Sequence, residues 1–146
     1  YVNRPEQTRE MLWTSPEGEV FYRSGDMGRV DEDGFLYILD RRKDMIISGG
    51  FNIYPVDLEK VLLAHPAIAD ATVIGIPSEH WGETPLGLVV LHPGGDDTET
   101  GILAWANEQL GKAQRLAAIE FRTTLPRSAI GKVLKRELRT PYWTGL

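Results

Sequence analysis

The chain has 146 residues, of which 42% are hydrophobic and 25% are charged, and its 16 basic and 21 acidic side chains give a formal charge of -5. This composition excludes a disordered chain, and the absence of cysteine excludes thiol catalysis, Cys-based zinc sites and disulfides. Its three histidines are too widely spaced for a metal cluster, no apolar run approaches the roughly 20 residues of a membrane span, and net acidity argues against non-specific nucleic-acid binding. We therefore expect a cytoplasmic protein.

The first forty residues are predicted to form a short helical segment followed by a small β meander. Strands are expected at 20–23, 28–30 and 35–39, and Asp33-Gly34 provides the tight turn between the last two. The chain opens abruptly at Tyr1 without an initiator methionine. We therefore expect these residues to come from a longer chain.

The charged run at 40–44 has no apolar partner and marks the expected boundary between two units. Beyond it, apolar runs predict strands at 45–47, 71–76, 86–91 and 119–123, and helical periodicity predicts helices from Pro55 to a stop at His65-Pro66, at 100–110 and at 134–138. The expected fold class is α+β, with helices flanking a small mixed sheet.

Basic side chains gather near the end of the sequence. This basic tail could meet one anionic ligand, and it comprises Arg127, Lys132, Lys135, Arg136 and Arg139.

Three polar clusters in loops are candidates for chemistry. Asp26 follows Gly25 at a strand end and could accept two ribose hydroxyl groups, although spacing alone favours a turn-forming aspartate. The segment 41–50 is, on periodicity alone, a solvated linker and a tight turn. The segment 126–132 ends in Lys132, but it has one glycine and no Ser or Thr after the lysine, so it is not a phosphate-binding P-loop. A loop lysine of this kind is usually a surface charge.

Taken together, these segments resemble the C-terminal third of the adenylate-forming acyl-CoA synthetases, a superfamily that also holds luciferases and peptide-synthetase adenylation domains. The resemblance is carried, in the family's order, by YRSGD at 22–26, DRRKDMIISGGFNIYP at 40–55, HP at 65–66, WGE at 81–83 and LPRSAIGKVL at 125–134. Members of this family use Mg-ATP to convert a carboxylic acid into an acyl adenylate and pyrophosphate. They then transfer the acyl group to coenzyme A, and the C-terminal domain rotates between the two steps.

The resemblance implies a division of the chain and a role for individual residues. Residues 1–40 match the tail end of the large N-terminal AMP-binding domain, 41–44 the hinge, and 45–146 the mobile C-terminal α+β domain. The implied site residues are Asp26 and Arg41 for the ATP ribose, Lys43 for the hinge, Ser48, Gly49 and Gly50 for the coenzyme A tunnel, Trp81 and Arg115 for the coenzyme A nucleotide, and Lys132 for catalysis of adenylation.

These assignments agree with elementary chemistry. A lysine is a compact mobile cation that can bridge an α-phosphate and an attacking carboxylate. Glycines let a thin pantetheine arm pass close to the backbone. A hinge lysine can be solvated before and after rotation.

The implied function is that of the C-terminal part of an acyl-CoA synthetase that acts on a carboxylic acid with ATP, Mg²⁺ and coenzyme A. Segment 46–55 resembles the fatty-acid and aryl-acid CoA ligases most, which points to fatty acid metabolism or a related pathway. In this family the phosphate loop, acyl pocket and Mg²⁺-binding glutamate belong to the large N-terminal domain, so we expect the chain alone to be inactive and residues 1–39 to be mobile or packed non-natively. No metal ligand is predicted within the chain.

Two alternatives remain at this point. One is a non-catalytic nucleotide- or protein-binding module with the same fold, and the other is a luciferase-like or carrier-protein-loading enzyme. The joint presence of Asp26, Arg41, Gly49 and Lys132 favours an enzyme, because a scaffold would need none of them.

Overall fold

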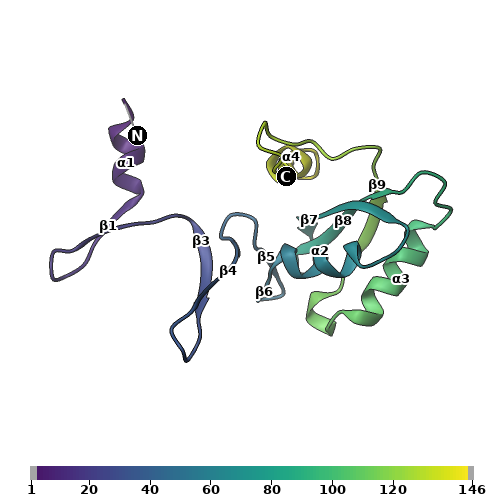
Figure 1. Ribbon diagram of the computed structural model, residues 1–146, viewed down its shortest axis with the longest axis horizontal. Helices are drawn as coiled ribbons and strands as arrows, with labels where there is room; N and C mark the ends of the chain where they lie inside the picture. Colours follow the sequence, from purple (N-terminus) through teal and green to yellow (C-terminus); the bar gives the residue numbers. More distant parts are fainter. Residues whose placement is uncertain (1–2, 145–146) are drawn as a thin grey trace. The chain divides into compact units, whose positions relative to one another are not determined.

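The computed structural model describes residues 3–144, so the extreme ends of the first and last predicted segments, 1–2 and 145–146, lie outside the described residues. The chain divides into two compact units, Tyr1–Lys43 and Asp44–Leu146 (Figure 1). Each unit is built on its own sheets.

The first unit contains a short helix and two hairpins. Helix α1 spans Pro5–Glu10, and the strands are β1 at Leu12–Thr14, β2 at Val20–Tyr22, β3 at Asp26–Val30 and β4 at Leu36–Arg41. Strand β1 pairs with β2 and β3 pairs with β4, both antiparallel, in two separate sheets. The expected meander is therefore two hairpins, separated by residues 23–25, which belong to no strand and in which Gly25 has a φ of 80°.

A carboxylate closes the second hairpin. Asp31 Oδ1 accepts hydrogen bonds from the backbone N–H of Phe35 (2.9 Å) and of Asp33 (3.1 Å), and Gly34 adopts a φ of 87° that a side chain would disfavour. The hydrogen bond from the Phe35 N–H, followed by one from the Tyr37 hydroxyl, lowers the pKa of Asp31 from its ordinary value. The side chain of Asp31 thus stabilises the predicted Asp33-Gly34 turn.

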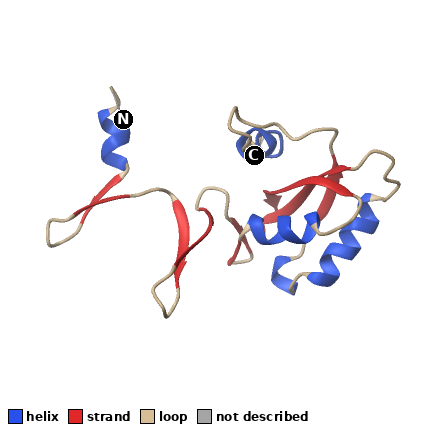
Figure 2. Ribbon diagram, in the orientation of Figure 1, coloured by secondary structure: helices blue, strands red, loops and turns tan. Residues whose placement is uncertain are grey.

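The second unit contains the larger sheet and three α-helices. Its elements are β5 at Ile46–Ser48, β6 at Phe51–Ile53, α2 at Pro55–Leu63, β7 at Ile68–Ser78, β8 at Gly82–Leu91, α3 at Glu99–Gln109, the 3₁₀ helix η1 at Lys112–Gln114, β9 at Ala118–Phe121 and α4 at Lys135–Trp143. The strand order is β6-β5-β8-β7, and β9 also pairs with β8. The β8–β9 pair is parallel and the others are antiparallel, so the predicted mixed sheet flanked by helices is confirmed (Figure 2).

Alternation along β7 and β8 gives the sheet two apolar faces. Val73 and Val89 belong to a core shared with α2 and α3, whereas Ile74 and Leu88 belong to a second core with Leu138 of α4. Figure 1 shows α2 and α3 next to each other and α4 apart from both. Each fully buried side chain of this kind contributes roughly 1.5–3 kcal/mol, so both faces stabilise the sheet that positions the loops.

None of the helices within residues 3–144 is long and apolar enough to cross a membrane.

Candidate functional site

In the first unit, the β3–β4 ladder places Asp26 directly opposite Arg41. The Arg41 Nε lies 3.7 Å from Asp26 Oδ1, and the two side chains are 52% and 33% exposed. Ser24 Oγ accepts a hydrogen bond from the Asp26 backbone N–H (3.2 Å), which fixes the start of the strand. The two residues assigned to a ribose from the sequence therefore lie side by side with solvent access.

A hollow of about 670 Å³ borders Arg41 of this pair. It is lined by Met11, Tyr22, Ser24, Gly25, Arg41, Arg42 and Lys43. The lining includes three basic residues and no acidic one, so the hollow favours an anionic ligand. Arg41 and the hinge candidate Lys43 thus border the same hollow.

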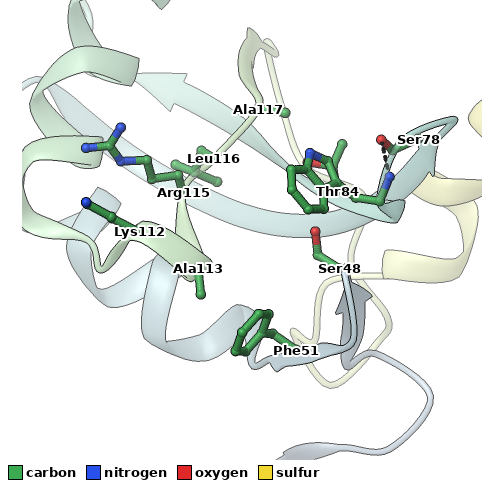
Figure 3. A pocket seen from close by; sticks show the side chains of 10 residues that line it. Ser48, Phe51, Ser78, Thr84, Lys112, Ala113, Arg115, Leu116 and Ala117 are labelled. Atoms are coloured by element: carbon green, nitrogen blue, oxygen red, sulfur yellow. Dashed lines mark hydrogen bonds between the residues drawn. The ribbon is translucent and has the colours of Figure 1, made fainter.

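In the second unit, one end of the sheet holds a pocket of about 600 Å³ (Figure 3). Its lining residues are Ser48, Phe51, Ser78, Trp81, Thr84, Lys112, Ala113, Arg115, Leu116 and Ala117. Three residues named from the sequence for coenzyme A, Ser48, Trp81 and Arg115, meet in this pocket although they come from separate parts of the chain.

The other two tunnel candidates, Gly49 and Gly50, do not line the pocket, but Gly49 packs against the lining residue Trp81. A Cβ added to Gly49 would meet the Trp81 ring at 2.6 Å, whereas one added to Gly50 would meet nothing within 4 Å. The Gly49 N–H also donates to the Trp81 carbonyl oxygen (2.9 Å). In this structure the bare face of Gly49 therefore accommodates the Trp81 ring.

Two cations stand at one end of the pocket. Figure 3 shows Lys112 and Arg115 together on the η1 side, with Ser48 and Ser78 toward the other end. Both cations are exposed. An elongated ligand with an anionic end would suit this arrangement. Lys112 was not predicted from the sequence. The signal that could have located it is a second basic residue three positions before Arg115.

Lys132 lies in a tight loop between β9 and α4. Arg127 pairs with Val133 across the loop, Lys132 N–H donates to Ser128 Oγ (3.2 Å), and Gly131 has a φ of 80°. The Lys132 side chain is exposed and forms no ion pair within residues 3–144. The loop therefore presents this ammonium group to solvent.

The basic tail is less available than the sequence suggested. Three of its five members bind carboxylates of the same unit: Arg127 binds Asp70, Lys135 binds Glu59 and Arg139 lies 4.0 Å from Glu83. Lys132 and Arg136 are exposed and have no such partner in the described part of the chain. Within the basic tail, Lys132 and Arg136 are thus the two cations available to an anionic ligand.

The pocket and the Lys132 loop lie at opposite ends of β7. Ser78 at the end of β7 lines the pocket, and Asp70 near its start binds Arg127 of the loop. Eight residues of extended strand separate them, which corresponds to about 26 Å. Strand β9 connects the same two ends in the opposite direction to β7, because it follows pocket residue Ala117 and leads into the loop.

Within residues 3–144, no group of three or more His, Cys, Asp or Glu side chains is arranged to hold a metal ion.

Residues 57–132 match the family model described as the AMP-binding enzyme C-terminal domain. The 2-succinylbenzoate–CoA ligase of Bacillus cereus (strain Q1) is 46% identical over 139 residues, which are 95% of this chain and 27% of that protein. The solved structure of ATP-bound MatB from Rhodopseudomonas palustris is 35% identical with a TM-score of 0.84, over 97% of this chain and 27% of that chain.

A second solved structure is the o-succinylbenzoate CoA synthetase MenE from Bacillus subtilis in complex with its acyl-adenylate intermediate. It is 40% identical with a TM-score of 0.81, over 94% of this chain and 27% of that chain. The chain thus spans about a quarter of the length of these relatives.

Proposed function

The chain belongs to the family of AMP-binding enzyme C-terminal domains, and from this we propose that it is the C-terminal part of an acyl-CoA ligase. The complete protein would activate a carboxylic acid with ATP to an acyl adenylate and then transfer the acyl group to coenzyme A. A cytoplasmic location remains part of this proposal.

The observation that carries the proposal is the separation of two candidate surfaces on one small unit. The exposed Lys132 and the pocket lined by Trp81 and Arg115 lie at opposite ends of β7, whose stretch from Asp70 to Ser78 spans about 26 Å by strand geometry. One fixed orientation could not bring both surfaces to the same acyl group. A ligase that rotates this unit between its two steps would use each surface in turn.

In the first step, we assign Lys132 to the charge that develops on the α-phosphate and the attacking carboxylate. A single exposed ammonium on a fixed backbone provides such charge stabilisation without a proton transfer. Asp26 and Arg41 would hold the ATP ribose, since a carboxylate accepts both hydroxyl hydrogen bonds and the arginine orients it.

In the second step, the pocket would receive coenzyme A. Ser48, Gly49 and Gly50 would border the pantetheine arm, the Trp81 ring would offer an apolar surface, and Lys112 and Arg115 would meet phosphate groups. We propose 41–44 as the hinge, with Lys43 as its pivot, and 1–40 as the end of the larger domain. Lys43→Pro would stiffen the hinge and separate the two half-reactions.

The acid is proposed as a fatty or aryl acid. This rests on the resemblance of segment 46–55 and on the name of the Bacillus cereus relative, a 2-succinylbenzoate–CoA ligase. From the family resemblance, we propose that the Mg²⁺ that would accompany ATP binds to protein outside this chain.

The experiment is ATP–pyrophosphate exchange and thioester formation by the complete protein with a panel of fatty and aryl acids. We expect exchange to depend on the acid and product formation to depend on coenzyme A. The proposal would be overturned if pyrophosphate exchange did not depend on any acid of the panel. It would also be overturned if the acyl adenylate formed no thioester with coenzyme A.

A further inference from the structure

We propose that Arg127 is a positioning residue, which fixes the backbone of the loop that carries Lys132 by joining Gly131 to Asp70 of β7. The inference rests on the proposed role of Lys132 in adenylation.

The Arg127 guanidinium donates hydrogen bonds to two acceptors at once. Nη1 donates to the carbonyl oxygen of Gly131 (2.7 Å), and Nη2 donates to Oδ2 of Asp70. The Gly131 carbonyl belongs to the peptide group whose nitrogen is that of Lys132. Arg127 therefore acts directly on the peptide bond from which the Lys132 side chain starts.

The other polar atom of the same peptide group is also held. Lys132 N–H donates to Ser128 Oγ (3.2 Å), while Ser128 N–H donates to the Lys132 carbonyl oxygen (2.8 Å). Because both the carbonyl oxygen and the N–H of this peptide group are hydrogen-bonded, its plane is fixed. The remaining freedom belongs to the four-carbon stem of Lys132.

The far end of the connection is a rigid one. Asp70 lies on β7, and its Oδ1 accepts a hydrogen bond from the Ala71 N–H (3.0 Å), which orients the carboxylate. The neighbouring Val73 and Ile74 are buried in the two cores. Movement of the loop relative to β7 would therefore require the Asp70–Arg127 contact to break.

A second ion pair fixes the other flank of the loop to the same region. Lys135 Nζ lies 2.9 Å from Glu59 Oε1, and both side chains are largely buried. Glu59 Oε1 also accepts hydrogen bonds from Thr72 Oγ1 (2.8 Å) and Val73 N–H (2.9 Å). The loop is thus anchored near β7 on both sides of Lys132.

An arginine is suited to this position because its planar fork reaches two acceptors in fixed directions, whereas a lysine is a point charge. Arg127→Lys retains a positive charge near Asp70 but loses the simultaneous bond to Gly131. Asp70→Asn retains the shape of the anchor and removes its charge. In both variants, the Lys132 ammonium would lose its fixed starting point, and a small misplacement of a catalytic group costs about 10²-fold.

The test measures the two half-reactions separately in the complete ligase. We expect Arg127→Lys and Asp70→Asn each to lower kcat of adenylation by about 10- to 100-fold, with little change in KM for ATP and with normal thioester formation from supplied acyl adenylate. Asp57→Asn is the matched control, because its carboxylate forms an exposed pair with Lys60 (3.9 Å) away from the loop. It should behave as wild type.

A double variant makes the test specific for action through Lys132. In a Lys132→Ala background, Arg127→Lys should cause no further loss, because the group it positions is gone. Equal losses in both half-reactions, or losses that add in the double variant, would overturn the inference. So would normal adenylation by Arg127→Lys and Asp70→Asn when Lys132→Ala is impaired. A Lys132→Ala enzyme with normal adenylation would instead overturn the proposed function.

Discussion

The Trp81 ring lies so close to Gly49 that a Cβ at position 49 would stand 2.6 Å from its Cε3 atom. The Gly49 backbone has a φ of 55°, which also disfavours a side chain. Glycine at this position thus serves the packing of Trp81 as well as any ligand that passes the loop. The two requirements can be separated by substitution.

Gly49→Leu should suppress thioester formation by about 10- to 100-fold, because the leucine would displace the Trp81 ring, and a small misplacement of reacting groups costs about 10²-fold in rate. Pyrophosphate exchange should continue, since Lys132 lies at the other end of β7. Gly94→Ala is the control, because Gly94 lies outside the pocket, its φ of 83° gives similar backbone strain, and its Cβ would meet no atom within 4 Å. If Gly49→Leu retained normal coenzyme A turnover, this loop would not border the thiol path.

Lys132→Ala should reduce adenylation by about 10²- to 10³-fold, as when one preorganised charge donor is removed from an active site. Thioester formation from supplied acyl adenylate should survive. Arg136→Ala removes another exposed cation of the same tail and should leave both half-reactions unchanged. Equal loss of the two half-reactions in Lys132→Ala would contradict the assignment.

Lys112→Ala and Arg115→Ala should each raise KM for coenzyme A by about tenfold or more, because a hydrogen bond to a charged group contributes about 1.5–3 kcal/mol. The maximal rate of thioester formation should change little. The measurement is a coenzyme A titration with supplied acyl adenylate. Lys60→Ala changes an exposed lysine outside the pocket and provides the baseline. If KM for coenzyme A in both pocket variants equalled that of Lys60→Ala, the pocket would not bind coenzyme A.

Alkaline pH should destabilise the second unit through Tyr142. Burial, followed by the Glu120 carboxylate, raises the pKa of Tyr142 from 10.0, so its contribution is complete below pH 10 and is lost as the pH rises through the higher folded pKa. Urea midpoints measured from about pH 8 to about pH 11 should therefore fall more for wild type than for Tyr142→Phe. Parallel curves would show that this tyrosine does not titrate with unfolding.

The 146-residue chain by itself should show no pyrophosphate exchange with Mg-ATP and a panel of fatty and aryl acids. Catalysis in the proposed ligase depends on groups positioned across two domains, and this chain covers 27% of its relative's length. Acid-dependent exchange above background would mean that the active site is complete within this chain.

Much of the fold was predictable because its longer elements carry strong local signals. Strands β7 and β8 are rich in Val, Ile and Leu, and α2 begins at Pro55, a residue suited to the first helical turn. The three-residue strands β1 and β6 were missed, since such short segments show little alternation. Helix α4 extends beyond the predicted end at Leu138.

The extension of α4 and the Arg127 clamp depend on distant partners. The helix continues past Pro141 because Tyr142 bonds Glu120 (2.7 Å) and Trp143 Nε1 donates to the Gly75 carbonyl oxygen (3.1 Å). Arg127 meets Asp70, which lies 57 positions earlier. Resemblance to a family singled out Lys132 and three of the pocket residues, Ser48, Trp81 and Arg115, but pairings at this separation became visible only in three dimensions.

The late position of α4 in the sequence affects how this unit is made on the ribosome. Strands β7 and β8 emerge well before residues 135–143, so the sheet face formed by Ile74, Leu86 and Leu88 stays uncovered until the last helix leaves the exit tunnel. A nascent chain that pauses before α4 would expose this apolar face to other proteins, the condition under which folding intermediates aggregate. Closure of this second core therefore waits for α4, and a chain interrupted between β8 and α4 would keep an apolar sheet face exposed.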